Sequence, residues 1–155
     1  MTSEDLVVVT AMFAHPALAE AWPGDNAARF ETGLQGAPDF APMVVELDRR
    51  LIGYIQYYEE SDPEYLHASI DIALHPDFTD RGLGTDALRT LARHLFEDRG
   101  HHRITIDPRA TNARAIASYR KVGFRDIGIM RQYERDNDGV WHDALFMDLL
   151  RDELR

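Results

Sequence analysis

Residues 69–85, SIDIALHPDFTDRGLGT, constrain the fold of this chain most strongly, because a strand pattern leads through a glycine turn into a helix pattern. Ile70 and Ile72 alternate with Asp71 and Ala73, so we expect the isoleucines on one face of a strand and the acid on the other. After the turn, five apolar residues recur at helical spacing: Leu88, Leu91, Ala92, Leu95 and Phe96. The segment therefore predicts a strand, a turn and an amphipathic helix that packs on a sheet.

The turn itself is a candidate phosphate site. Gly82 and Gly84 have no Cβ, so the backbone can adopt positive φ and a bulky anion can approach the main chain. We expect the helix to begin near Gly84 or Thr85, where free amides and the positive end of the helix dipole favour phosphate. The same pattern also fits a plain tight turn. A P-loop is excluded because no Lys-Ser or Lys-Thr follows Gly84, and the third glycine of a dinucleotide fingerprint is absent.

Composition narrows the functional classes. With 155 residues and 45% apolar content, we expect one domain that spans residues 1–155. There is no apolar run of the ~20 residues that a membrane span needs, and MTSEDL lacks a signal peptide's basic region, so we expect a cytoplasmic location. The absence of cysteine excludes disulfides, thiolate metal sites and cysteine nucleophiles.

The charge balance bears on partners. Lys and Arg number 17 against 27 Asp and Glu, a net charge of −10, which disfavours nucleic acid and anionic membranes as partners. Such a surface attracts small cations such as polyamines, although an acidic surface also serves solubility alone.

The remaining patterns place the other elements. We expect helical structure over 2–22 and a helix over 27–34, then strands over 43–47 and 51–58 joined by a short hairpin turn, with Gly53 as a candidate bulge. The helix after the glycine turn should end at Arg99 with Gly100 as its cap. A strand over 103–106, a helix over 112–122 stopped by Gly123, and a hairpin of 124–134 with 140–150 complete the chain. This order predicts an α/β (α+β) fold, a mixed central sheet with a central parallel strand pair and flanking helices.

In such a sheet, ligands bind where the two parallel strands end. Asp71 lies near the end of the first of these strands and Asp107 at the end of the second, so we expect two carboxylates at one cleft. Asp107 precedes Pro108, and a purely structural role in starting a turn is the alternative for it.

Two segments together resemble the GNAT superfamily of acetyl-CoA-dependent N-acetyltransferases. TDRGLGT is similar to the family's acyl-CoA pyrophosphate loop, usually Gln/Arg-x-x-Gly-x-Gly/Ala, and DPRATNARAIASYRKVGF resembles the next motif, in which an Asn and a helix Tyr flank the pantetheine and thiol. The second match is the more specific, and it rests on Asn112, Arg114, Ala115, Tyr119, Gly123 and Phe124. The resemblance covers nearly the whole chain. Within the superfamily, the order of segments is most similar to aminoglycoside 6′-N-acetyltransferases.

This resemblance implies a GNAT fold, acetyl-CoA as cosubstrate, no metal, and direct transfer to an amine. It implies Asp71 as general base, Tyr119 as the acid that protonates the departing thiolate, and Trp22, Asp71 and Asp107 as contacts to a cationic substrate. The amides of residues 72–74 are implied to polarise the thioester. The implied cofactor contacts are Ile72, Ala73, Leu74, Thr79, Asp80, Arg81, Gly82, Leu83, Gly84, Thr85, Asn112 and Ala115. From the residues alone, Tyr119 also fits a core aromatic on an amphipathic helix.

The sequence departs from the family pattern in two places. Thr79 replaces the usual Gln or Arg, and Asp80 places a negative charge near the pyrophosphate, which Arg81 is expected to offset. The chain also begins at the family's first helix, so we expect either a trimmed start or a sheet with one strand fewer, whose free edge is available for a homodimer.

Other polar residues allow two interpretations. The acidic residues Glu59, Glu60, Asp62 and Glu64 either rim an amine site or form a solvated loop. Tyr54, Tyr57 and Tyr58 alternate faces, so we expect some in the core and some at the cleft. His101 and His102 lack a second ligand pair at metal spacing, and we expect both at the surface.

Three functions fit these observations. The first is acetylation of the 6′-amine of an aminoglycoside, which confers antibiotic resistance. The second is acetylation of another amine, such as a polyamine, a siderophore lysine or a protein N-terminus. The third is a non-catalytic acyl-CoA-binding module, which only Thr79 and Asp80 favour.

Overall fold

The computed structural model describes residues 1–155 and contains a six-stranded mixed sheet in the order β1-β2-β3-β4-β6-β5. The strands are β1 Phe40–Leu47, β2 Arg50–Glu60, β3 His67–Leu74, β4 Arg103–Ile106, β5 Arg125–Arg135 and β6 Trp141–Leu150. The helices are α1 Ser3–Phe13, α2 Pro16–Ala21, α3 Asn26–Leu34, α4 Leu83–Glu97 and α5 Ala113–Val122. Short 3₁₀ turns cover Pro76–Phe78 and Arg151–Glu153. The predicted mixed sheet with a parallel pair, β3 and β4, is confirmed.

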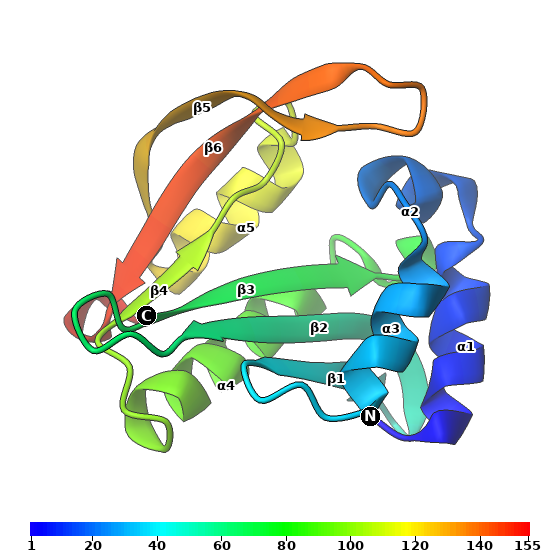
Figure 1. Ribbon diagram of the computed structural model, residues 1–155, viewed down its shortest axis with the longest axis horizontal. Helices are drawn as coiled ribbons and strands as arrows, with labels where there is room; N and C mark the ends of the chain where they lie inside the picture. Colours follow the sequence, from blue (N-terminus) through cyan, green and yellow to red (C-terminus); the bar gives the residue numbers. More distant parts are fainter.

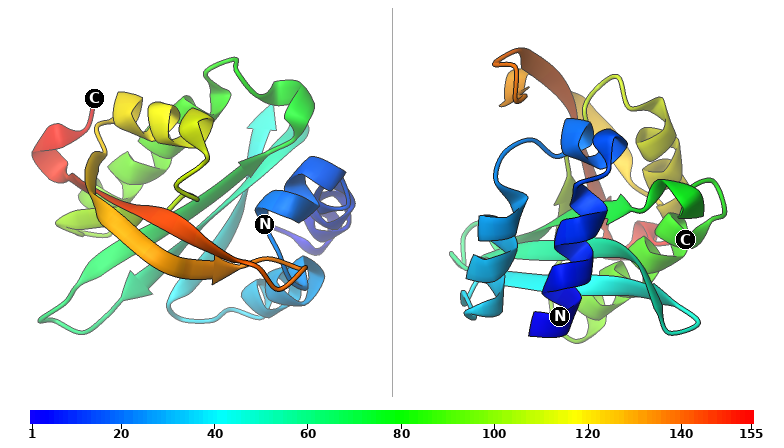
Figure 2. Two further views of the ribbon diagram at one scale, coloured as in Figure 1. Left: turned by 90° about the horizontal axis from the view of Figure 1, so that it is seen from above. Right: turned by 90° about the vertical axis from the view of Figure 1, so that its right-hand side faces the viewer.

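Helices cover both faces of the sheet (Figures 1 and 2). The larger core, which includes Ile70 and Ile104, packs under α4 and α5. The smaller core, which includes Tyr54 and Ala73, packs under α1, α2 and α3. Successive side chains of a strand point to opposite faces, so Asp71 lies on the face of Ala73 and α1–α3, away from Ile70. No helix has the length and hydropathy that a membrane span requires.

The parallel pairing of β3 and β4 is short. It joins Ala68 with Ile104 and Ser69 with Thr105, and beyond these residues the two strands diverge (Figure 1). β3 continues beside β2, whereas β4 continues beside β6. The main chain of residues 70–74 therefore has a strand neighbour on its β2 side only, and a split opens between the carboxyl ends of the parallel pair.

The N-terminal helical segment is two helices, separated by Ala14 and His15. α1 begins with a capping box: the Thr2 hydroxyl accepts from the Asp5 amide at 3.2 Å, and the Asp5 carboxylate accepts from the Thr2 amide at 2.6 Å. Pro16 has no N–H to continue α1, but it fits the first turn of α2, where the His15 ring nitrogen accepts from the Ala17 amide.

The first hairpin differs from the prediction at its start. β1 begins at Phe40, three residues before the predicted start at residue 43, because Phe40 pairs with Tyr58 and their rings stack at 4.6 Å. Pro42 is tolerated because β1 is an edge strand. The predicted irregularity at Gly53 is confirmed: the register passes from Glu46 opposite Leu51 to Val45 opposite Gly53. A Cβ at Gly53 would lie 2.7 Å from the Ala73 carbonyl oxygen, so only glycine fits there.

The predicted helix stops are close to the observed ones. α4 ends at Glu97, two residues before the predicted end, but Gly100 adopts the expected left-handed conformation with φ of 78°. The His101 amide donates back to the Leu95 carbonyl, which closes the helix end. Gly123 ends α5 with φ of 121°, as predicted.

Candidate functional site

Two cavities lie along the split between β3 and β4. The carboxylate cavity, of about 450 Å³, is lined by both Asp71 and Asp107. The glycine-turn cavity, of about 360 Å³, is lined by Gly82, Gly84 and one face of α5. Five residues line both cavities: Ala21, Trp22, Ile72, Asn112 and Tyr119. The two cavities therefore meet, and a group bound in one can reach a group bound in the other.

The glycine-turn cavity has an open helix N-terminus. Gly82 precedes α4 with φ of 78°, and no side chain caps the helix, so its first amides are free for a ligand. Positive φ was expected at Gly84, but this residue is helical. A Cβ at Gly84 would lie 3.3 Å from a Leu74 methyl group. The second left-handed residue is instead Asp80, with φ of 58°.

Ten of the twelve predicted cofactor contacts line the glycine-turn cavity: Ile72, Ala73, Leu74, Thr79, Asp80, Gly82, Gly84, Thr85, Asn112 and Ala115. Arg81 and Leu83 do not. The Arg81 guanidinium lies over the Phe78 ring, 5.5 Å from its centre, and it forms no ion pair with Asp80. Arg114 of α5 takes that place, 3.8 Å from the Asp80 carboxylate, because α5 packs beside α4 at this end.

Asp71 is held by the neighbouring strand. It lies opposite Gln56 of β2, whose amide nitrogen donates to Asp71 Oδ2 at 2.7 Å. Burial raises the pKa of Asp71, the Gln56 hydrogen bond opposes that rise, and the nearby Asp107 carboxylate adds to it. A carboxylate with a raised pKa is a stronger base, which suits a group that must take a proton from an ammonium.

Asp107 is held by β5. The Tyr133 hydroxyl donates to Asp107 Oδ2 at 3.1 Å, and the adjacent Glu134 accepts from Arg109 at 2.6 Å. These residues reach the cavity because β5 is irregular between Met130 and Glu134. Within this stretch Gln132 has φ of 51°, and its amide donates to Asp143. Burial raises the pKa of Asp107, against the effect of the Tyr133 hydrogen bond.

The carboxylate cavity also contains cations. Its charged lining comprises Asp71, Asp107, Glu134, Arg29, Arg109 and Arg135. Arg109 and Glu134 form an ion pair and neutralise each other. Two carboxylates and two arginines therefore remain for a ligand.

Tyr119 combines both of its expected environments. It is buried in the larger core, with 7% of its surface exposed, and it lines both cavities. Burial raises the pKa of its phenol, and the Asp71 and Asp107 charges add to the rise. The phenol therefore keeps its proton at neutral pH and can donate it.

Trp22 and Asn112 complete the junction of the cavities. Trp22 lies between α2 and α3, and its ring packs edge-on against Phe13 and Tyr54, at 5.1 and 5.9 Å. Asn112 caps α5 by accepting from the Ala115 amide at 3.1 Å. Both side chains are thus fixed by local structure before any ligand binds.

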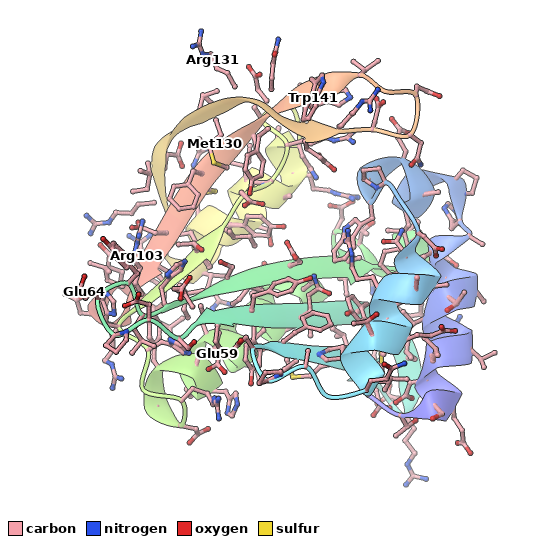
Figure 3. All side chains as sticks on the ribbon, viewed as in Figure 1. Glu59, Glu64, Arg103, Met130, Arg131 and Trp141 are labelled. Atoms are coloured by element: carbon pink, nitrogen blue, oxygen red, sulfur yellow. The ribbon has the colours of Figure 1, made fainter.

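The acidic loop lies elsewhere. Glu59, Glu60, Asp62 and Glu64 line neither cavity, and Figure 3 shows Glu59 and Glu64 at the end of the sheet away from α2. The reason is topological: β2 and β3 are antiparallel, so their connection lies at the amino end of β3, whereas Asp71 lies toward its carboxyl end. The interpretation of these residues as a rim of the amine site is wrong.

The expected surface position of His101 is also wrong. Its side chain is buried, and its Nε2 lies 2.7 Å from Glu59, which also accepts two hydrogen bonds from Arg99. His102 is exposed, as expected. No tyrosine of β2 lines either cavity, so the expectation that some reach the cleft is wrong as well.

Three polar neighbours of the expected site residues escaped the sequence patterns: Gln56, Tyr133 and Glu134. Gln56 gave a usable signal, because it is a single amide within the apolar run 51–58. Tyr133 and Glu134 gave none, since their position depends on a bulge in a strand that lies far along the chain from Asp107.

Comparison with known proteins agrees with this architecture. Residues 10–124, more than half of the chain, match the acetyltransferase (GNAT) family. The chain belongs to this family. The resemblance that the two sequence motifs indicated is confirmed.

Among curated relatives of this GNAT chain, the [ribosomal protein bS18]-alanine N-acetyltransferase of Escherichia coli (strain K12) is 39% identical over 82 residues, 51% of this chain and 52% of the relative. The alignment thus spans about half the length of that relative. The aminoglycoside N(6′)-acetyltransferase type 1 of Klebsiella pneumoniae is 27% identical over 147 residues, 83% of this chain and 73% of the relative. A crystal structure of aminoglycoside acetyltransferase AAC(6′)-Ib with coenzyme A and kanamycin has a TM-score of 0.80 and 28% identity, and covers 99% of this chain and 93% of its own.

Proposed function

We propose that this GNAT chain transfers an acetyl group from acetyl-CoA to the 6′-amine of an aminoglycoside. The observation that carries the proposal is the junction of the two cavities, where Tyr119 and Ile72 border both the carboxylate cavity and the glycine-turn cavity. A cationic amine and an anionic cofactor can meet there. The relatives that act on aminoglycosides support this choice of substrate.

The glycine-turn cavity fits acetyl-CoA. The uncapped amides of α4 suit the pyrophosphate, and the edge of β3 that faces away from β2 offers main-chain groups of residues 72–74 to the pantetheine arm. Bound acetyl-CoA supplies the acetyl group as a thioester. Asp80 is the one carboxylate among the predicted cofactor contacts on this cavity, and it is exposed and lies near Arg114, which limits its repulsion of a phosphate.

Asp71 and Tyr119 supply the proton transfers. Asp71 accepts one proton from the substrate ammonium, directly or through a water, which frees the nitrogen lone pair to form the new C–N bond. As the C–S bond breaks, the Tyr119 hydroxyl gives its proton to the leaving sulfur, and the nitrogen of the new amide releases its second proton, which restores the Tyr119 phenol. A main-chain amide of residues 72–74 stabilises the negative charge on the carbonyl oxygen. Asp107 binds a second ammonium of the polycation, and Trp22 provides an apolar wall.

A thiol-release assay over a panel of amines tests the proposal. We expect acetyl-CoA turnover with aminoglycosides that carry a 6′-amine and none with their 6′-hydroxy counterparts. Asp71→Asn should lower kcat by at least about 10²-fold, the usual minimum for loss of a general base. Full turnover by this variant across pH would refute the role of Asp71, and equal rates with 6′-hydroxy compounds would refute the choice of amine.

A second candidate substrate is another amine, in particular a protein N-terminus. The Escherichia coli relative supports it, and so do Arg29 and Arg135, which give the carboxylate cavity partners for an anionic group that aminoglycosides lack. Peptides with free N-termini and spermidine in the same panel separate the candidates. Failure to bind coenzyme A in calorimetry would exclude both.

A further inference from the structure

We propose that Gln56 is a positioning residue for Asp71, with its amide oriented by the hydroxyl of Tyr54. This inference rests on the proposed function, in which Asp71 accepts the substrate proton.

The geometry begins with the pairing of β2 and β3. Gln56 lies directly opposite Asp71, and its side chain points to the same face of the sheet. Gln56 is completely buried. A buried amide is costly unless its donors and acceptor are bonded, so the positions of its partners decide how it must lie.

Those partners form a directed chain. The Tyr54 hydroxyl donates to Gln56 Oε1 at 2.7 Å, and Gln56 Nε2 donates to Asp71 Oδ2 at 2.7 Å and to the Tyr58 hydroxyl at 3.2 Å. Tyr54 is completely buried, which raises the pKa of its phenol and keeps it a donor. With the amide reversed, Oε1 would face the carboxylate oxygen, and two acceptors would meet unless Asp71 were protonated. The observed direction therefore favours the ionised carboxylate, the form that can accept a proton.

This series of hydrogen bonds also leaves one carboxylate oxygen of Asp71 free. Asp71 uses Oδ2 for Gln56 and makes no other hydrogen bond within the protein, while its side chain lines the carboxylate cavity. The Gln56 bond thus fixes the carboxyl group through one oxygen and leaves Oδ1 for the amine or a bridging water.

Charged groups from several elements surround Asp71, and they affect its ionisation together with the Gln56 hydrogen bond. Asp107 beyond β4 and Glu134 of β5 disfavour its ionised form, and Arg29 of α3 favours it. Tyr119 of α5 and Tyr133 of β5 are neutral at physiological pH, since both have a raised pKa. Burial is the largest influence that raises the pKa of Asp71, and the Gln56 hydrogen bond is the largest that lowers it.

The test is a pair of measurements on Gln56→Leu, which replaces the amide with an apolar side chain of similar size. Carboxyl carbon NMR, with the Asp71 signal assigned by Asp71→Asn, should show its pKa raised by one unit or more. The acidic limb of kcat/KM for the amine should move to higher pH by the same amount, while KM for acetyl-CoA stays unchanged. Tyr54→Phe should shift both in the same direction by less, since the amide is kept but its orientation is released.

Tyr57→Phe is the matched control, because it removes a hydroxyl from the same strand on the opposite face. Tyr57→Phe should leave both the Asp71 titration and the acidic limb of kcat/KM unchanged. If Gln56→Leu fails to fold, Tyr54→Phe carries the test. An unchanged Asp71 pKa in the folded variants overturns the proposal. A shifted Asp71 pKa without a shift of the acidic limb of kcat/KM also overturns it.

The NMR titration needs no turnover. If no amine in the panel is acetylated, the proposed function fails, while the titration still decides whether Gln56 controls the ionisation of Asp71.

Discussion

Asp71 and Tyr119 share an environment that changes the protonation of both groups in the same direction. Burial disfavours the charged form of each, so the pKa of both groups rises. In the proposed mechanism, this rise makes the Asp71 carboxylate a better proton acceptor and keeps on Tyr119 the proton for the leaving thiolate. Asp71 lines the carboxylate cavity alone, whereas Tyr119 lines both cavities.

Tyr119→Phe tests the second of these roles. We expect kcat to fall by up to about 10²-fold, the low end for loss of a general acid, because water can enter the space of the hydroxyl and protonate the thiolate in its place. Steady-state kinetics with saturating acetyl-CoA measure the effect. Tyr65→Phe, on an exposed tyrosine away from both cavities, is the control. A wild-type kcat for Tyr119→Phe would remove its role as the acid.

Between elements, the turn of the β5–β6 hairpin lies beside the α2–α3 loop (Figure 2). Asn137 in this turn accepts from the Gly24 amide at 2.9 Å and donates to the Ala19 carbonyl at 3.4 Å. Trp22 and Pro23, which line the carboxylate cavity, lie between these two contacts in the chain. One side chain therefore ties together two segments that lie far apart in the sequence.

Asn137→Ala should loosen this tether and with it the position of Trp22 and Pro23. Because each of the two exposed hydrogen bonds contributes about 0.5–1.5 kcal/mol, we expect KM for the amine to rise by about 2- to 10-fold with KM for acetyl-CoA unchanged. Asn137→Asp is the matched control, since it keeps the acceptor for Gly24, and it should show a smaller rise. Equal increases in both KM values would mean that the turn supports the fold and not the cavity.

A second tether joins β2 to the connection between α4 and β4. Glu59 binds Arg99 and the buried His101, and these hydrogen bonds lower the pKa of its carboxyl. A lowered pKa in the folded state stabilises the protein above the unfolded pKa, about 4.3, and this stabilisation is lost as pH falls through the folded value.

Glu59→Gln should therefore lower the free energy of unfolding by about 1–3 kcal/mol at pH 7, because hydrogen bonds to a charged group are lost beside a buried His101. The difference from wild type should shrink below pH ~4. Urea unfolding over a pH series measures it, with the exposed neighbour Glu60→Gln as control. A difference that stays constant down to the acid limit would contradict the sign argued from the pKa.

For the whole molecule, the net charge of −10 creates a field that attracts cations. We expect kcat/KM for an aminoglycoside to fall as ionic strength rises through ~0.1 M, where the Debye length is about 10 Å. A substrate with a single amine should respond less, because fewer charges feel the field. Rates in a salt series measure this, and an equal response of both substrates would place recognition in the cavity alone.

Much of the fold was predictable because its signals are local. The alternation around Asp71, the stripe on α4 and the glycine stops each depend on neighbours within a turn or a strand, and the structure confirms them. The start of β1 was not predictable in this way. Phe40 becomes part of a strand through its stacking with Tyr58, which lies on the partner strand.

The same distinction between local signals and long-range contacts applies to the candidate site. Asp71, Asp107 and the glycine turn are visible in the sequence because each lies near a recognisable end of a strand or helix, and Tyr119 is visible through the motif that contains it. The Gln56 hydrogen bond depends on strand register, and the Tyr133 hydrogen bond depends on a bulge. The ion pair of Arg114 with Asp80 depends on the approach of α5 to α4, and the Asn137 tether on the approach of two distant segments. These contacts join residues distant in the chain, and packing fixes them only after the local elements have formed.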